Sequence, residues 1–221
     1  MSLFDVKKLT LGYQSKQVIQ GLSFSLDKPF LFVLGANGIG KTTFLKAIAG
    51  LVPYVGSILS HNKAMDEVPV SICLQNNSLS QDLLVKDILL MGLYRDKKMF
   101  QSFSSVDDAT IQSAAKSFHI THLLDQYYFE LSGGQQKMVW ICQSFIHKTS
   151  LVLLDEPTNS LDARFKKRLV NYLKNSDRTI ICATHDFDFI AELPNAQYLI
   201  LQKEKHFLTD VLDIPHFKSM I

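Results

Sequence analysis

Cysteine is scarce in this 221-residue chain, and long apolar runs are absent from it. Cys73, Cys142 and Cys182 stand far apart and form no pair with the spacing of a metal site or a disulfide framework. No stretch approaches the roughly 18 apolar residues of a membrane-spanning helix, and the first ten residues lack the apolar core of a signal peptide. The sequence therefore argues against secreted and membrane-integral proteins and predicts a reducing, cytoplasmic compartment.

An excess of charge of one sign is also missing. Lysine and arginine number 23 and aspartate and glutamate number 21, which leaves a net charge of +2. So small a balance excludes bulk charge as the force that would bind nucleic acid or an anionic membrane, and no nucleic-acid partner is expected. With 47% hydrophobic and 20% charged residues, the composition is that of a globular protein rather than a disordered one.

The first third of the chain has the pattern of strands. Residues 22–26 alternate apolar and polar, as in a half-buried antiparallel strand, whereas residues 30–34 form the continuous apolar run of a strand covered on both faces. Further strands are expected over 4–11 and 68–74. A helix is expected over 41–49, with Gly50 ending it.

The middle of the chain changes to helical spacing, and the last third alternates strands with helices. This alternation predicts a parallel sheet and an α/β fold. We expect one domain over 1–221, with a core of about 1–77 and 149–221 and a helical insertion of about 78–148. The expected helices are 85–94, 106–118, 120–126, 135–147, 163–173 and 187–193, and the later strands are 151–154, 179–183 and 197–202.

A glycine-rich loop follows the apolar strand 30–34 and opens the next helix. Its sequence fits G-x-x-x-x-G-K-[ST], in which glycines let backbone N–H groups turn toward phosphates and the helix start adds partial positive charge. Lys41 is expected to reach the β- and γ-phosphates and Thr42 to ligate Mg²⁺. The loop alone does not separate kinases, GTPases and ATPases. The phosphate-binding candidates are Gly35, Ala36, Asn37, Gly38, Ile39, Gly40, Lys41, Thr42 and Thr43.

Two adjacent carboxylates end the apolar strand 151–154. A strand parallel to the one before the glycine-rich loop would bring Asp155 beside Thr42, where it can hold Mg²⁺ directly or through water. Glu156 would then face the γ-phosphate and deprotonate the attacking water. His185 follows another apolar strand, so it should meet the same crevice and contact the γ-phosphate or the water.

A second helix start carries small residues and free N–H groups. The pentapeptide Leu131-Ser-Gly-Gly-Gln135 opens the helix that precedes Asp155 in the sequence. One chain thus offers two helix N-termini suited to phosphate. If one helix start faces the nucleotide of its own chain, the other is free to cap the nucleotide of a partner chain. This predicts a symmetric pair of chains with two nucleotides at their interface.

These motifs in this order resemble the nucleotide-binding subunit of an ATP-binding cassette (ABC) transporter, over nearly the whole chain. The resemblance implies a P-loop NTPase core with a parallel sheet, an N-terminal antiparallel β part and an inserted helical subdomain. It implies ATP and Mg²⁺ as cofactors and ATP hydrolysis as the activity. It also implies that the signature of one subunit closes over the ATP of the other, through Ser132, Gly133, Gly134 and Gln135.

Three further positions match that family. Tyr13 resembles the aromatic residue that stacks on adenine, and Gln75 resembles the glutamine that senses Mg²⁺ and links the catalytic core to the helical insertion. Asp162 resembles the residue that contacts the partner's P-loop across the dimer interface. The chain departs from the family after the signature, where Gln136, Met138, Trp140 and Gln143 replace the usual arginines and small residues.

The resemblance also implies partners. It implies a homodimer or a pair with a second ABC ATPase subunit, membrane permease subunits and, indirectly, a substrate-binding protein, at the inner face of the cell membrane. Residues 85–92 and 105–108 resemble importers of metal chelates such as siderophores, haem or cobalamin. Two alternatives stay open: an ABC ATPase that acts on nucleic-acid or protein assemblies, and a catalytically silent module.

Overall fold

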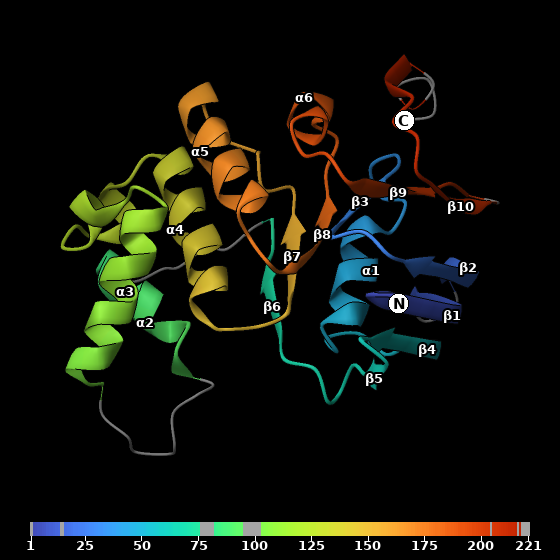
Figure 1. The fold of residues 1–221 in the computed structure, drawn as a ribbon, viewed down its shortest axis with the longest axis horizontal. Coiled ribbons are helices and arrows are strands. Elements are labelled where there is room, and N and C mark those ends of the chain that lie inside the picture. Colours follow the sequence, from blue (N-terminus) through green and yellow to red (C-terminus); the bar gives the residue numbers. More distant parts are fainter. Residues whose placement is uncertain are drawn as a thin grey trace.

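The computed structural model describes residues 2–13, 16–75, 82–94, 103–203, 205–215 and 217, without the side chains of 13, 16 and 17. Figure 1 shows a helical part beside a central sheet and a smaller sheet at the other side. The strands are β1 Phe4–Tyr13, β2 Lys16–Leu26, β3 Phe30–Leu34, β4 Val55–Ser60, β5 Lys63–Ala64, β6 Val70–Cys73, β7 Leu151–Asp155, β8 Thr179–Ala183, β9 Ala196–Leu201 and β10 His206–Thr209. The helices are α1 Lys41–Ile48, α2 Val85–Met91, α3 Ser105–Ser117, α4 Gly133–Ile146, α5 Ala163–Lys174 and α6 Phe187–Ala191.

The central sheet has the strand order β10-β9-β3-β8-β7-β6. Every pairing from β9 to β6 is parallel, which confirms the parallel sheet expected from the alternation of strands and helices. Strand β10 adds an antiparallel edge next to β9 and was not expected from the sequence. Because β3, β7 and β8 run in the same direction, their carboxyl ends meet at one edge of the sheet.

Alternate side chains of β3 enter two different apolar clusters. Phe30, Phe32 and Leu34 pack on one face with the helical part, α5 and α6. Leu31 and Val33 pack on the other face with α1 and the small antiparallel sheet. The sheet therefore separates two cores, which is why its central strands β3, β7 and β8 are buried at every position and mostly apolar.

The small sheet has the order β2-β1-β4-β5 and is antiparallel. It confirms the antiparallel β part expected at the N-terminus, although β4 and β5 were missed. Helix α1 lies between this sheet and the central one (Figure 1). Gly56 shows why β4 has a weak sequence signal: its φ of 112° and the carbonyls of Lys7 and Lys8, less than 3 Å from any Cβ built there, require glycine rather than a typical strand residue.

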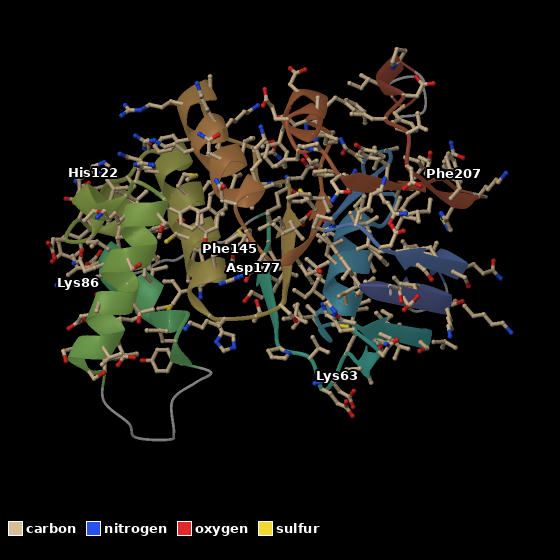
Figure 2. The ribbon with its side chains drawn as sticks, in the orientation of Figure 1. Lys63, Lys86, His122, Phe145, Asp177 and Phe207 are labelled. Carbon is tan, nitrogen blue, oxygen red and sulfur yellow. The ribbon has the colours of Figure 1, made fainter. Side chains whose placement is uncertain are left out.

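The inserted helices α2, α3 and α4 form one bundle that shares an apolar cluster with the central sheet. Phe145 of α4 contacts Phe118 and Tyr172, with ring centroids 5.7 and 5.0 Å apart, so an aromatic cluster joins α3, α4 and α5. In Figure 2, Phe145 lies within this part, while Lys86 and His122 point outward.

The helix expected over 120–126 is wrong. The structure has a single 3₁₀ turn, Thr121–Leu123, because the buried Ile120, Leu123 and Leu124 satisfy apolar spacing within one tight turn. Helix α4 begins at Gly133, two residues before the expected start. The serine-rich stretch 100–105 has the polar composition of a break between helices, and its residues 100–102 lie outside the described part of the chain. None of the helices described is long and apolar enough to cross a membrane.

The two positive-φ glycines of the antiparallel sheet provide a matched stability test. Gly56→Ala should lower the free energy of unfolding by about 3 kcal/mol, because its Cβ would meet backbone oxygen at 2.6 Å as well as adopt a left-handed conformation. Gly21→Ala should cost only about 1 kcal/mol, because its Cβ meets nothing within 4 Å. Urea unfolding of both variants measures the difference, and equal losses would contradict the close approach at Gly56.

Candidate functional site

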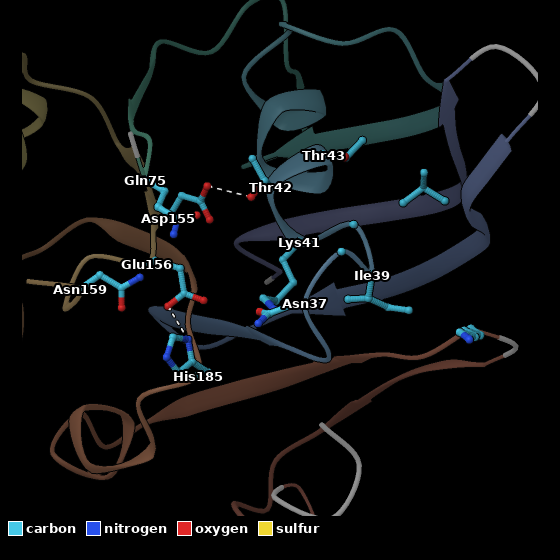
Figure 3. A pocket seen from close by; sticks show the side chains of 14 residues that line it. Asn37, Ile39, Lys41, Thr42, Thr43, Gln75, Asp155, Glu156, Asn159 and His185 are labelled. Carbon is cyan, nitrogen blue, oxygen red and sulfur yellow. Dashed lines mark hydrogen bonds and ion pairs between the residues drawn. The ribbon is translucent and has the colours of Figure 1, made fainter. Parts of the chain in front are cut away.

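A cavity of about 680 Å³ lies at the carboxyl edge of the central sheet. Figure 3 shows the start of α1 on one side of it and the ends of β6, β7 and β8 on the other. The residues that line it are Val18, Asn37, Gly38, Ile39, Gly40, Lys41, Thr42, Thr43, Gln75, Asp155, Glu156, Asn159, His185 and Lys203.

The glycine-rich loop wraps around the start of α1. Gly40 caps the helix with a φ of 115°, and any Cβ there would lie 2.2 Å from Val18 Cγ1, so only glycine fits. The Lys41 ammonium donates to the carbonyls of Gly35 (2.7 Å) and Ala36 (3.2 Å). Those two residues therefore hold the lysine but do not line the cavity themselves.

Lys41 is buried, and burial lowers the pKa of its ammonium, while Glu156 and then Asp155 oppose that shift. In a poorly solvated cavity an ammonium is screened less than at the surface, so it interacts more strongly with an anion at the same distance. The loop, the helix start and this ammonium together make the cavity suited to a polyphosphate.

Thr42 and Asp155 meet across the cavity. The Thr42 hydroxyl donates to Asp155 Oδ2 at 2.8 Å, from residues 113 positions apart (Figure 3). Strand β8 lies between β3 and β7, and the contact forms because α1 packs over β7 and β8. Burial raises the pKa of Asp155 and Glu156 adds to the rise, while the hydrogen bond from Thr42 and the charge of Lys137 oppose it.

This oxygen pair fits Mg²⁺. The ion is commonly bound by one or two protein oxygens, with phosphates and water completing an octahedron. Thr42 and Asp155 supply such a hydroxyl and carboxylate. The described residues contain no cluster of three or more His, Cys, Asp or Glu that would form an all-protein metal cage.

Glu156 occupies an unusual backbone conformation next to Asp155. Its φ is 46°, in the left-handed region, and its N–H donates to the carbonyl of Ala183 at 2.8 Å. His185 Nδ1 lies 2.9 Å from Glu156 Oε2, an ion-pair distance (Figure 3). A carboxylate has several acceptor lone pairs, so beside this contact with His185 the Glu156 side chain keeps the capacity to accept a hydrogen bond from a water molecule.

Gln75 enters the cavity from the exposed turn after β6. It stands on the same edge as Asp155 because β6 pairs in parallel with β7. Tyr13 is expected beside the nucleotide, but its side chain lies outside the described part of the chain.

The signature residues do not reach this cavity. Ser132 caps α4 and accepts from the N–H of Gln135 at 3.4 Å, while the Gln135 side chain accepts from the N–H of Ser132 at 2.9 Å. Gly134 is buried against the carbonyl of Ser160. Asp162 similarly caps α5 by accepting from the N–H of Phe165 at 2.8 Å. Ser132, Gly133 and Asp162 stay exposed.

Sequence reasoning missed four residues at or behind this cavity. Val18, Asn159 and Lys203 line it, and Lys137 lies behind it with hydrogen bonds to the backbone at two strand ends. No motif marked Val18 or Lys203, because strand pairing and a hairpin bring them there. Lys137 follows the signature, in a stretch noted only for its departures from the family.

The sequence of this chain is similar to those of known proteins. The family profile described as ABC transporter matches residues 19–159. The achromobactin transport ATP-binding protein of Dickeya dadantii (strain 3937) is 32% identical over 201 residues, with 85% of this chain and 75% of that protein covered. The manganese transport system ATP-binding protein of Halalkalibacterium halodurans is 29% identical over 217 residues, with 95% and 86% covered.

A solved structure is similar over nearly the full length. It is described as a metal-chelate type ABC transporter in an inward-facing conformation, and it superposes with a TM-score of 0.86 at 26% identity. The match covers 99% of this chain and 88% of that one. The α/β fold with one mixed and one antiparallel sheet is therefore that of these ATPases.

The raised pKa of Asp155 makes a stability prediction. Its favourable contribution is present below the ordinary value of 3.8 and is lost as the pH rises through the raised value, so burial of this carboxyl costs more at pH 7 than at pH 4. Asp155→Asn should therefore raise the melting temperature of the nucleotide-free protein, more at pH 7 than at pH 4. Exposed Asp66→Asn is the control. A variant that melts below the wild type at pH 7 would contradict this electrostatic account.

Proposed function

The chain belongs to the ABC transporter family, and on that premise we propose that it is the ATP-hydrolysing subunit of a membrane transporter. The observation that carries the proposal is the single cavity that holds Lys41, the Thr42–Asp155 pair and Glu156. These groups supply the three requirements of phosphoryl transfer to water: a phosphate cradle, a metal position and a base.

In this proposal the glycine-rich loop binds the ATP phosphates through its N–H groups and Lys41. Mg²⁺, when bound, neutralises charge on the β- and γ-phosphates, with Thr42 and Asp155 as the residues that would hold it. Gln75 lines the same cavity and is the proposed further contact to the metal and to the attacking water. Tyr13 remains the candidate for stacking on adenine.

Glu156 is the proposed general base. Its carboxylate lines the cavity and can accept a hydrogen bond from the attacking water, and the adjacent His185 can orient that water or contact the γ-phosphate. Because Asp155 serves the metal and Glu156 serves the water, neighbouring carboxylates divide the two tasks.

We further propose that two copies, or this chain and a second ABC ATPase subunit, complete each site together. The support is that Ser132, Gly133 and Asp162 are exposed and absent from the lining of their own cavity. The start of α4 offers N–H groups to an anion, as phosphate sites do. A partner's signature would thus cover the ATP held by this chain's P-loop.

The proposed transporter is an importer of a metal chelate. The support is the similarity to an achromobactin transport ATP-binding protein and to a structure of metal-chelate type. The other partners would be membrane permease subunits and, indirectly, a substrate-binding protein, with this chain attached peripherally at the cytoplasmic face. Because this cavity is proposed to bind ATP rather than the transported substrate, those partners would recognise the substrate.

Glu156→Gln tests the base. The variant should bind ATP with near wild-type affinity but hydrolyse it about 10²- to 10⁴-fold more slowly, because the amide cannot take the proton. It should also accumulate as an ATP-dependent dimer on gel filtration. Phosphate release and elution volume are the measurements, and turnover at the wild-type rate would exclude Glu156 as the base.

A mixing experiment tests the shared site. Lys41→Ala should abolish ATP binding in its own P-loop, and Ser132→Arg should block closure over the partner's ATP. Each variant alone should be inactive, but their mixture should regain activity, because the mixed dimer contains one intact P-loop facing one intact signature. The double variant Lys41→Ala/Ser132→Arg, mixed with either parent, is the control. No recovery on mixing would contradict the composite site.

A further inference from the structure

A buried lysine lies behind the cavity and belongs to none of the motifs. Lys137 stands in the second turn of α4, and only 8% of it is exposed. Its ammonium donates to the carbonyl of Leu74 and to that of Asp155, both at 3.3 Å. Since a buried charge is costly unless it is hydrogen-bonded, these contacts fix where the ammonium lies.

Both carbonyls directly precede a residue of the proposed chemistry. The carbonyl of Leu74 shares a planar peptide unit with the N–H of Gln75, and that of Asp155 shares one with the N–H of Glu156. An ammonium that holds these two oxygens therefore also orients the peptide planes that precede Gln75 and Glu156, and with them the two side chains. It also links the ends of β6 and β7 to α4.

The peptide unit between Asp155 and Glu156 is held at both ends. Lys137 donates to its oxygen, and its N–H donates to the carbonyl of Ala183. Glu156 needs such support because its φ of 46° is unfavourable for a residue with a side chain. Strained residues persist where the surrounding contacts determine them more than once.

We propose that Lys137 is a positioning residue for hydrolysis, which holds Glu156 in its left-handed conformation and Gln75 at the cavity edge. This inference rests on the proposed function, because it requires Glu156 to act on the attacking water. Lys137 is not among the residues that line the cavity. Its loss should therefore slow turnover while leaving the phosphate cradle formed by Lys41 intact.

Lys137→Met removes the donor and keeps an unbranched apolar stem in the helix. We expect kcat to fall about 10- to 100-fold, as for a base displaced by a fraction of an ångström. The Kd of the non-hydrolysable analogue AMP-PNP should change less than about twofold, since the loop is untouched. A folded variant with kcat within about twofold of wild type would overturn the proposal.

Gln136→Met is the matched control on the same helix. It removes a comparable side-chain hydrogen bond, from Gln136 to the carbonyl of Tyr128 at 3.1 Å, and Gln136 is not among the residues that line the cavity. Its kcat should stay near wild type, and an equal loss of kcat in both variants would overturn a role specific to Lys137. Thermal melting of each variant verifies folding.

Lys137→Gln decides the matter if the methionine variant does not fold. Its amide is a donor on a stem one bond shorter, so it cannot hold both carbonyls and should lower kcat about three- to tenfold at unchanged AMP-PNP affinity. A Lys137→Gln protein with wild-type kcat would overturn the proposal.

A double-mutant cycle with Glu156→Gln separates positioning from an independent effect. If Lys137 acts through Glu156, adding Lys137→Met to Glu156→Gln should lower the residual rate by less than about twofold, whereas independent effects would multiply. Full multiplication would overturn the proposal. If the Glu156→Gln variant hydrolyses ATP at the wild-type rate, the proposed base is wrong. If Glu156→Gln is slow but the Lys137 variants hydrolyse ATP at the wild-type rate, the base stands and the role proposed for Lys137 is wrong.

Discussion

The hydrogen bond between Thr42 and Asp155 is the contact around which the site is organised. It joins the first turn of α1 to the end of β7, and it can form only because the parallel strands present their carboxyl ends at one edge. Lys41 precedes one partner in the sequence and Glu156 follows the other. A single contact between distant segments thus places the phosphate cradle, the metal position and the base within one cavity.

Burial strengthens the electrostatic interactions of these groups, and it also makes their charged forms costly in free energy. Both Lys41 and Asp155 are almost inaccessible, and burial moves their pKa values in opposite directions, each toward the neutral form. Each is kept charged mainly by groups of the opposite sign or by hydrogen bonds nearby. Such an arrangement is stable only when the backbone around it is rigid, which the buried central strands provide.

Much of this could be predicted from the sequence, because the decisive signals are local. Apolar runs that end in a glycine-rich loop or in two acids identify both the strand and the edge at which it ends, and the parallel sheet follows from their alternation. The missed elements lack such signals: β4 contains Gly56, and β10 exists only as a partner of β9. Ile120, Leu123 and Leu124 have the spacing of a helix but form one turn. Lys137 was missed because its partners are backbone carbonyls, which no side-chain pattern records.

The central sheet separates two apolar clusters, and the larger one runs without interruption from the sheet face into the helical subdomain. Apolar contacts have no preferred direction, so helices seated on such a face can slide a short distance while keeping most of their buried area. Movement of the subdomain in this protein is therefore expected to be a shear rather than a hinge. The hydrogen bonds from Lys137 of α4 to the carbonyls at the ends of β6 and β7 would then limit how far the subdomain can slide.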